Sequence, residues 1–492
     1  MMKYIYMLMF IFYSFNVFSQ TLKDSILELT LEKAIDVARK HSPDALIARQ
    51  GFRSQYWNYR YFKANYLPSL TFSSTPNFNH SINAITLPDG TSQYVQQNQL
   101  MTDANFSLNQ NITLTGGNLF LQTGIQRLDI FDNKTYSYKT NPVLIGYQQS
   151  LLGYNSLKWD KRIEPIRFEE AKKSYVETME LVSANTTLKF FNLAKAQTNL
   201  NIAKFNYNQA DTLYTFAQGR YDIGTITENE MLQLEINRLT EESNVMNAQI
   251  DVDDCMQDFR AYLGINETVN ISADVEDTIP QFLVNINQAL ELAFANSPQM
   301  LGMKRRKLES ESAIAQAKSS AGLKADIYAQ FGLTQTGDEL NSAYKNPLNQ
   351  QYVQIGISFP ILDWGRGKGQ IRVAQSQRDM VFTQEEQNRS NFEQNMLKVV
   401  KQFNLQAGKV VVAAKTDRVA THRNEVARKL YILGKSTILD LNASTSEKDV
   451  SKRNYINALY NYWSLYFTLR SLTLYDFQKG VALTEDYDNL LK

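Results

Sequence analysis

Four short segments of the chain alternate apolar and polar residues with a period of two. Asp326–Thr334 and Val353–Phe359 alternate regularly, Ala104–Leu114 does so over a longer stretch, and Val143–Leu151 is less regular. Because successive side chains of a β-strand point to opposite faces, each segment predicts a strand with one apolar face. Alternation over about 10 residues fits two structures, a half-buried sheet of a soluble protein and a lipid-facing wall around a polar lumen.

Two neighbouring segments extend the predicted sheet. Leu67–Phe78 predicts a further strand, which Pro68 opens. The pair Gly116–Gly117 separates Ala104–Leu114 from Leu119–Ile130. A glycine pair between two strand-like segments is typical of a hairpin turn, so the sequence predicts a β-hairpin here.

A second periodicity, with steps of four and three residues, predicts long helices that pair as coiled coils. One helix is expected from Ser156 to about Ala217, and another over Gln370–Leu433, which would reach roughly 95 Å if continuous. Their other faces are rich in Asn, Gln, Lys and Glu, so we expect water along one side. The residues of the two seams are Ala196, Leu200, Ala203, Tyr207, Ala210 and Tyr214, and Phe392, Met396, Val399, Phe403, Ala407, Val410 and Ala414.

The same order of elements occurs twice along the chain. Leu31–Pro43 returns as Ile286–Pro298, 255 positions later, with two alanines and a Ser-Pro pair at matching places. Further on the shift is 210, so that Gly146 corresponds to Gly356. The first copy therefore has about 45 extra residues between Leu67 and Gly146, which the predicted hairpin explains. A duplicated helix–strand–helix unit indicates an internal repeat.

The repeat sets the predicted organisation of an α+β chain. The parts are a signal peptide at 1–19, a first repeat with its linker at 20–283, a second repeat at 284–475 and a C-terminal tail at 476–492. In the first repeat we expect strands within 67–151 and long helices at about 156–217 and 227–263. In the second repeat we expect strands at about 325–335 and 352–361 and helices at about 367–432 and 437–475.

The N-terminal segment predicts export from the cytoplasm. Lys3 precedes an apolar run from Tyr4 to Phe18, and this run of about 15 residues is too short to span a membrane as a helix. We interpret it as a signal peptide that is removed after Ser19. The lone Cys255 excludes a disulfide framework within the chain.

Charge and motifs argue against nucleic acid as a partner and against an enzyme. The 51 Lys and Arg residues balance the 50 Asp and Glu residues, whereas nucleic-acid-binding proteins carry a basic excess. His41, His80 and His422 stand in unrelated contexts, and no metal-binding motif occurs, so we expect neither a metal nor a cofactor. The spacing in Gly365–Gly369 differs from phosphate-binding loops and predicts a turn from strand to helix.

The number of strands limits what one chain can build. Each copy offers two strands, or four in the first copy if the hairpin is included, while the smallest membrane barrels have about eight. Unpaired strand edges are not tolerated in hydrocarbon, so several chains would have to share one barrel. The alternative is a soluble periplasmic coiled-coil scaffold with small sheets, which would not need an apolar face toward lipid.

Several features together resemble the TolC-type outer-membrane efflux and secretion channels over about Leu29–Tyr475. These features are the alanines and Ser-Pro pair of both repeats, the Leu67–Pro68 start of the first strand, the Phe359–Gly365 exit from the last strand, and turns centred on Gly224 and Gly434. The resemblance implies a homotrimer with a pooled β-barrel, usually of twelve strands, in the outer membrane. It also implies a long α-helical barrel across the periplasm.

The resemblance further implies a function and partners. The chain would be the outer-membrane exit duct of a tripartite export system, in contact with outer-membrane lipid. An inner-membrane pump would drive substrates into the duct, and a periplasmic adaptor would join the two at the exposed tips around Gly224 and Gly434. Pro68, Pro360 and Gly365 are expected at the transitions between strands and helices.

The turn of the second copy is similar to the periplasmic aperture of this family. Tyr431 would belong to a closed-state latch, and Asp440 would line the narrowest point as a ring of three carboxylates. Such a ring should raise the proton affinity of at least one member and attract cations. The chain departs from the family at Ala443, where a second aspartate is common, and at Ser436, where a latch arginine is absent beside Lys435.

The turn of the first copy places Glu230 where some members of the family have an acidic latch residue. We hypothesise that Glu230 restrains Tyr431 or Lys435 of a neighbouring helix pair. Thr227-x-x-Glu230 and Thr437-x-x-Asp440 also match the capping box that starts a helix. Capping and an aperture role do not exclude each other, and both remain open for the two acids.

Overall fold

The computed structural model describes residues 26–265, 269–433 and 435–491, and it divides into two compact units. The predicted signal peptide and Gly434 lie outside the described residues. The unit that we call the helical unit comprises residues up to Ala48, Glu177–Ala289 and Leu397–Leu483. The sheet unit comprises Arg49–Val176, Leu290–Met396 and the residues from Thr484 onward. Each unit draws on both sequence repeats.

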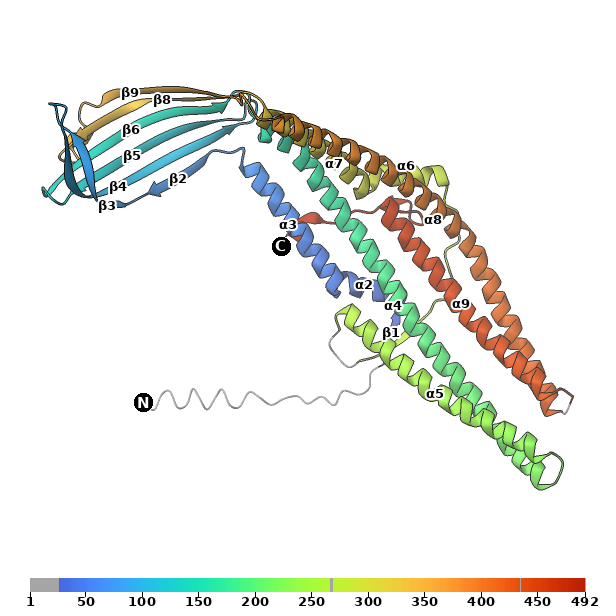
Figure 1. Ribbon diagram of the computed structural model, residues 1–492. Helices are drawn as coiled ribbons and strands as arrows, with labels where there is room; N and C mark the ends of the chain where they lie inside the picture. The colour runs from blue at the N-terminus through green and yellow to red at the C-terminus, as the bar shows by residue number, and fades with distance from the viewer. Residues whose placement is uncertain (1–25, 266–268, 434, 492) are drawn as a thin grey trace, which may run out of the picture. The chain divides into compact units, whose positions relative to one another are not determined.

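The sheet unit is built around one antiparallel sheet, with its long strands side by side in Figure 1. The strand order is β2-β4-β5-β6-β8-β9, and β3 pairs with the N-terminal half of β4, residues Ser92–Met101. The strands are β2 (Ser69–Ser74), β3 (Asn77–Thr86), β4 (Ser92–Ile112), β5 (Gly117–Ile130), β6 (Thr135–Ser150), β8 (Lys324–Gly337) and β9 (Leu348–Ser358). The hairpin predicted at Gly116–Gly117 is confirmed as β4–β5.

The strand predicted over Leu67–Phe78 is broken in the structure. Its first part is β2 and its second part begins β3, and both pair with β4, so the two pieces together occupy one strand position. The break falls at Thr75 and Pro76, and the Thr75 amide still donates to the carbonyl of Asp103 (3.3 Å). Pro76 has no amide hydrogen to continue the ladder, which explains the interruption.

One face of the sheet is apolar across its strands. A single row of paired residues runs from Leu70 on β2 through Leu108 on β4, Leu121 on β5 and Ile145 on β6 to Phe331 on β8. These side chains are between 39% and 70% exposed, although they are large and apolar. The predicted alternation is therefore confirmed, but the apolar face is not the covered side of a soluble sheet. An exposed apolar surface of this kind marks contact with a membrane or a partner.

The opposite face of the sheet is mostly polar. Ser107 on β4 pairs with Gln122 on β5, and Gln330 on β8 pairs with Tyr352 on β9. Between them, Phe120 lies directly over Gly146, where a Cβ would come within 2.0 Å of the ring. Gly146 is therefore required by a close approach, and this accounts for the glycine at this place in the first repeat.

The long helices of the two repeats have equal lengths. The helices α4 (Ser156–Asp222) and α8 (Arg366–Ile432) each have 67 residues. Their partners α5 (Glu228–Leu263) and α9 (Ile438–Thr473) each have 36 residues. At about 1.5 Å per residue, a 67-residue helix is about 100 Å long. The structure thus repeats the helical half of the predicted unit with the same dimensions.

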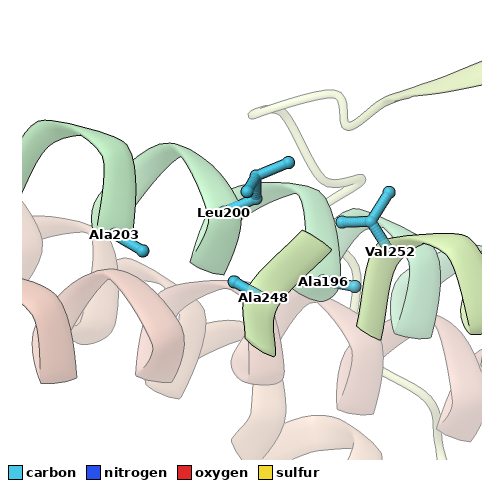
Figure 2. Packing of buried hydrophobic residues seen from close by; sticks show 5 residues of the cluster. All are labelled: Ala196, Leu200, Ala203, Ala248 and Val252. Carbon is cyan, nitrogen blue, oxygen red and sulfur yellow. The ribbon is translucent and has the colours of Figure 1, made fainter. Parts of the chain in front are cut away.

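A coiled-coil seam holds α4 and α5 together in the helical unit. Figure 2 shows Ala196, Leu200 and Ala203 of α4 beside Ala248 and Val252 of α5. All five are buried, and the small alanines allow the two helices to approach closely. The predicted spacing of four and three residues is confirmed along this part of α4.

The Ser-Pro pairs mark the breaks between consecutive helices. The helix α2 (Leu31–His41) ends before α3 (Pro43–Ala64), and α6 (Ile286–Asn296) ends before α7 (Pro298–Ala321). At the first break Ser42 Oγ accepts a hydrogen bond from the Ala45 amide (3.1 Å). At the second break Ser297 Oγ accepts one from the Gln299 amide (3.2 Å). Serine satisfies an unpaired amide at each helix start, and proline fits the first turn.

The remaining elements are short. In the helical unit β1 (Ile26–Thr30) pairs in parallel with β7 (Asn270–Asp274), and β10 (Tyr475–Asp476) pairs with β11 (Val481–Ala482). The sheet unit also contains a 3-10 turn at Ser342–Tyr344 and α10 (Tyr487–Leu490). Across the described ranges, none of the helices combines the length and apolar character needed to cross a membrane.

Candidate functional site

The turn between α4 and α5 forms one tip of the helical unit. Gly224 has a φ of +73°, the left-handed conformation that glycine adopts without strain, and its amide donates to the Tyr221 carbonyl (2.8 Å). The next amide, of Thr225, donates to the carbonyl of Arg220 (2.8 Å). Space around Gly224 is open, so the glycine is needed for its backbone conformation and not for packing.

Glu230 completes a capping box at the start of α5. Thr227 Oγ1 accepts a hydrogen bond from the Glu230 amide (3.3 Å), and the Thr227 amide donates to Glu230 Oε2 (3.0 Å). Both partners therefore satisfy amides that have no acceptor within the helix. The capping interpretation of this motif is confirmed, while a latch role for Glu230 stays a prediction.

Asp440 takes an equivalent position at the start of α9. The hydroxyl of Thr437 accepts from the Asp440 amide (3.2 Å) and donates to Asp440 Oδ2 (2.8 Å). Ser436 Oγ, which stands in place of the family's arginine, also approaches Asp440 Oδ2 (3.4 Å). The carboxylate itself is exposed to solvent.

Within one chain the pKa of Asp440 is lowered, chiefly by the hydrogen bonds from the side chain and the backbone of Thr437. The sequence led us to expect a raised proton affinity from the repulsion of three carboxylates. That repulsion requires three copies of Asp440 close together and stays a prediction. The local environment acts in the opposite direction, because hydrogen bonds to a carboxylate favour its charged form.

Glu230 and Tyr431 lie on the wall of the same cavity, which has a volume of about 430 Å³. The cavity lies between the tip of α4 and α5 and the end of α8 with the start of α9, all within the helical unit. Arg220 and Ser436 also line it. Lys435, by contrast, has an exposed side chain, and its amide donates to the Leu430 carbonyl (2.9 Å).

Arg220 is a candidate that sequence reasoning missed. The family pattern placed an arginine at position 436, where this chain has serine, and Lys435 was the nearest cation along the sequence. The structure instead places Arg220, from the other helix pair, on the cavity wall with Glu230 and Tyr431. The alignment of the two repeats matches equivalent positions of the two tips, and it does not show which residues of one tip lie close to the other tip.

The predicted strand–helix transitions lie at the ends of sheet strands. Pro68 directly precedes β2, and Pro360 follows β9 by two residues. Gly365 has a φ of +82° just before α8 begins. The residue that organises this last turn is Asp363, whose Oδ1 and Oδ2 accept from the amides of Gly365 (2.9 Å) and Gly367 (2.8 Å).

A buried ionic network in the helical unit is a second feature that the sequence did not reveal. Glu180 on α4 is only 1% exposed and bonds to Arg39 of α2 (2.9 Å) and Arg470 of α9 (3.0 Å). Arg470 also bonds to Asp476 (3.1 Å), which accepts from the Tyr466 hydroxyl (2.9 Å). The network ties three helices that are far apart in the sequence.

The repeat points to one member of this network, because Arg470 corresponds to Arg260 in the first copy, but it does not point to the partners of Arg470. The two arginines have different partners. Arg260 donates to the Val269 carbonyl (3.3 Å), whereas Arg470 pairs with two carboxylates. Only the tertiary structure distinguishes them. Among the described residues, no cluster of His, Cys, Asp and Glu side chains could hold a metal ion.

Comparisons with known proteins relate the second repeat to a known family. The family described as Outer membrane efflux protein matches residues 289–473, which cover most of the second repeat. A search of curated protein sequences finds no significant match. The sequence match therefore rests on the second repeat.

Solved outer membrane channels share the fold over nearly the whole chain. CmeC of Campylobacter jejuni is similar with a TM-score of 0.67 and 15% identity over 93% of this chain and 88% of that chain. VceC of Vibrio cholerae gives 0.64 and 13% over 90% and 95%. The open state of MtrE from Neisseria gonorrhoeae gives 0.51 and 14% over 93% and 90%.

The sequence identities are low, so these structures establish the fold alone. The family match assigns the second repeat to a known family of sequences. Both agree with the duplicated helices and the apolar-faced sheet described above. Residues 289–473 therefore match the outer membrane efflux protein family, and the chain as a whole has the fold of solved outer membrane channels.

Proposed function

We propose that this chain is the exit duct of a tripartite export system, receiving substrates from an inner-membrane pump through a periplasmic adaptor. The family implies a trimeric channel. The observation that carries the proposal is the open sheet with an exposed apolar face, from which both strand pairs lead into 67-residue helices. A soluble coiled-coil scaffold would not need an exposed apolar face on its sheet.

The edges of the sheet support assembly with further copies. In the described part of the chain β2 and β9 stand at the two ends of the strand order, each with a partner on one side. The free backbone groups of such edges must be paired inside a membrane. A copy of the same chain offers the complementary edge, so a ring of copies closes the wall.

We assign the aperture to the tips of the two helix pairs. Glu230, Arg220 and Tyr431 line one cavity, and their carboxylate, guanidinium and phenol groups can hold the two helix pairs together. Asp440 would add negative charge at the narrowest point and favour cations. The turn around Gly224 and the exposed residues Leu433 and Lys435 on either side of position 434 are the proposed docking surface for the adaptor.

Reconstitution of the purified full-length protein tests this function. We expect an oligomer that resists dissociation in sodium dodecyl sulfate until heated, and single-channel currents in planar bilayers. Dissociation to a monomer without heating, together with the absence of conductance at every voltage, would contradict the proposal. The duct alone does not select a substrate class, so the adaptor and pump encoded nearby would identify it.

A further inference from the structure

The first repeat has one strand pair more than the second. With the shift of 255, β2 and β3 correspond to β8, and with the shift of 210, β6 corresponds to β9. In the second repeat the two corresponding strands pair directly with each other. In the first repeat β4 and β5 stand between them, so the inserted hairpin occupies the middle of the wall.

The inserted hairpin has the length and the faces of its neighbours. The strands β4 and β5 have 21 and 14 residues, whereas a membrane strand needs about 9–11. Leu108 and Leu121 lie in the same exposed apolar row as Ile145 and Phe331. A hairpin that stood in water beyond the membrane would not need to continue this row.

The turn of the hairpin is fixed at the end of the sheet where the helices begin. Asn155, at the start of α4, donates from Nδ2 to the carbonyls of Thr113 (3.0 Å) and Leu114 (3.3 Å). Gln149 Nε2, at the end of β6, donates to the Thr115 carbonyl (2.7 Å). These contacts hold the turn at the same level as the strand–helix transitions of the original strand pairs.

Strand β4 of the hairpin is bonded to the two residues that follow α3. Asn111 Nδ2 donates to the Asn65 carbonyl (3.0 Å), and Gln110 Nε2 donates to the Tyr66 carbonyl (3.1 Å). Leu114 at the turn is 88% exposed. The hairpin therefore extends from the outer loops to the level where helices and strands meet.

We propose that the β4–β5 hairpin spans the outer membrane as part of the barrel wall, so that a trimer closes a barrel of eighteen strands instead of the family's usual twelve. This inference rests on the proposed function. Each chain supplies six strand positions, because β2 and β3 share one of them. Barrel diameter grows roughly linearly with strand number, so the lumen in the membrane is about one and a half times as wide.

The inserted hairpin widens the barrel without adding helices. The added strands connect to each other and to sheet strands, so they bring no additional helix. The first repeat enters its strands from α3 and leaves them into α4, as the second enters from α7 and leaves into α8. The hairpin thus enlarges the membrane part of the duct while the number of helices stays that of a two-strand repeat.

Site-directed fluorescence tests the inference in the full-length protein with Cys255→Ala as background. Single cysteines replace neighbouring residues on the apolar and polar faces of the hairpin, Leu108 and Asn109 on β4 and Leu121 and Gln122 on β5. Each variant is labelled with bimane and reconstituted into phosphatidylcholine vesicles, with and without spin-labelled lipid. The control pair is Ile355→Cys and Gln354→Cys on β9, a strand common to both repeats.

We expect spin-labelled lipid to quench the labels at positions 108, 121 and 355 and to spare those at 109, 122 and 354. Alternation on β9 without alternation on β4 and β5 would overturn the eighteen-stranded wall and leave the duct intact. Loss of alternation on β9 as well would contradict the proposed function itself.

Discussion

Glu230 at the start of α5 and Tyr431 at the end of α8 face the same cavity, although they are about two hundred positions apart in the chain. Glu230 is also the acidic partner of a capping box. The two roles can be separated experimentally, because Thr227 belongs to the cap and does not line the cavity.

We predict that Glu230→Ala increases the open conductance or the open probability of the channel. The reason is that the carboxylate is removed from the cavity where the two helix pairs meet. The measurement is single-channel recording in planar bilayers. The matched control is Thr227→Ala, which removes the other half of the cap at a cost of about 1 kcal/mol. If both variants raise conductance equally, the effect belongs to helix capping and the latch role is wrong.

Asp440 should set the block of the channel by divalent cations. Asp440→Asn removes the charge but keeps an oxygen that can accept the Thr437 hydroxyl, so α9 should still begin normally. We expect the apparent affinity for a divalent blocker to fall, measured from the block of single-channel current. Block of unchanged strength in this variant would place Asp440 away from the constriction.

The Glu180 network should dominate the stability of the helical unit. Glu180→Gln leaves Arg39 and Arg470 without their shared charge partner, and breaking a buried ion pair costs about 3–5 kcal/mol. We expect a marked fall in the melting temperature followed by circular dichroism. Arg260→Met, at the corresponding place in the first repeat, removes one hydrogen bond to a carbonyl and should cost much less. Equal losses would show that the network contributes no special stability.

Glu177 on α4 should make stability depend on pH. Burial raises its pKa from 4.5 to about 7, so the folded chain keeps this proton at pH values where the unfolded chain has lost it. Stability from this group is therefore present at low pH and is lost as pH rises from about 4.5 to 7.

We predict that Glu177→Gln becomes more stable than the wild type as pH rises, by about 3 kcal/mol at most above pH 7. Melting temperatures of both proteins between pH 5 and pH 8 measure the difference. Glu169→Gln, at an exposed position of the same helix, serves as the control. A constant difference between wild type and Glu177→Gln across this range would show that Glu177 has an ordinary pKa.

Local patterns in the sequence predicted the elements well, because period and repeat are properties of neighbouring residues. The alternation in Ala104–Leu114 and Val353–Phe359 corresponds to β4 and β9, and the seam through Ala196 and Leu200 corresponds to the contact between α4 and α5. The exception is Leu67–Phe78, where the break at Pro76 depends on the pairing with β4.

The site was less predictable, because its residues come together from separate helix pairs. The family pattern identified Glu230 and Tyr431, which share a cavity, but Lys435 points into solvent and Arg220 was missed. The network of Glu180 and Arg470 joins positions 290 apart, and no local period connects them. The direction of the Asp440 pKa also depended on Thr437, which the sequence had suggested only as a cap.

We propose that further copies of the same chain complete this open sheet. Cryo-electron microscopy of the detergent-solubilised full-length protein tests it most directly. We predict a ring of three chains in which β9 of each copy pairs with the β2–β3 edge of the next around one continuous lumen. A particle made of a single chain, with its own two sheet edges joined and no shared lumen, would contradict the account.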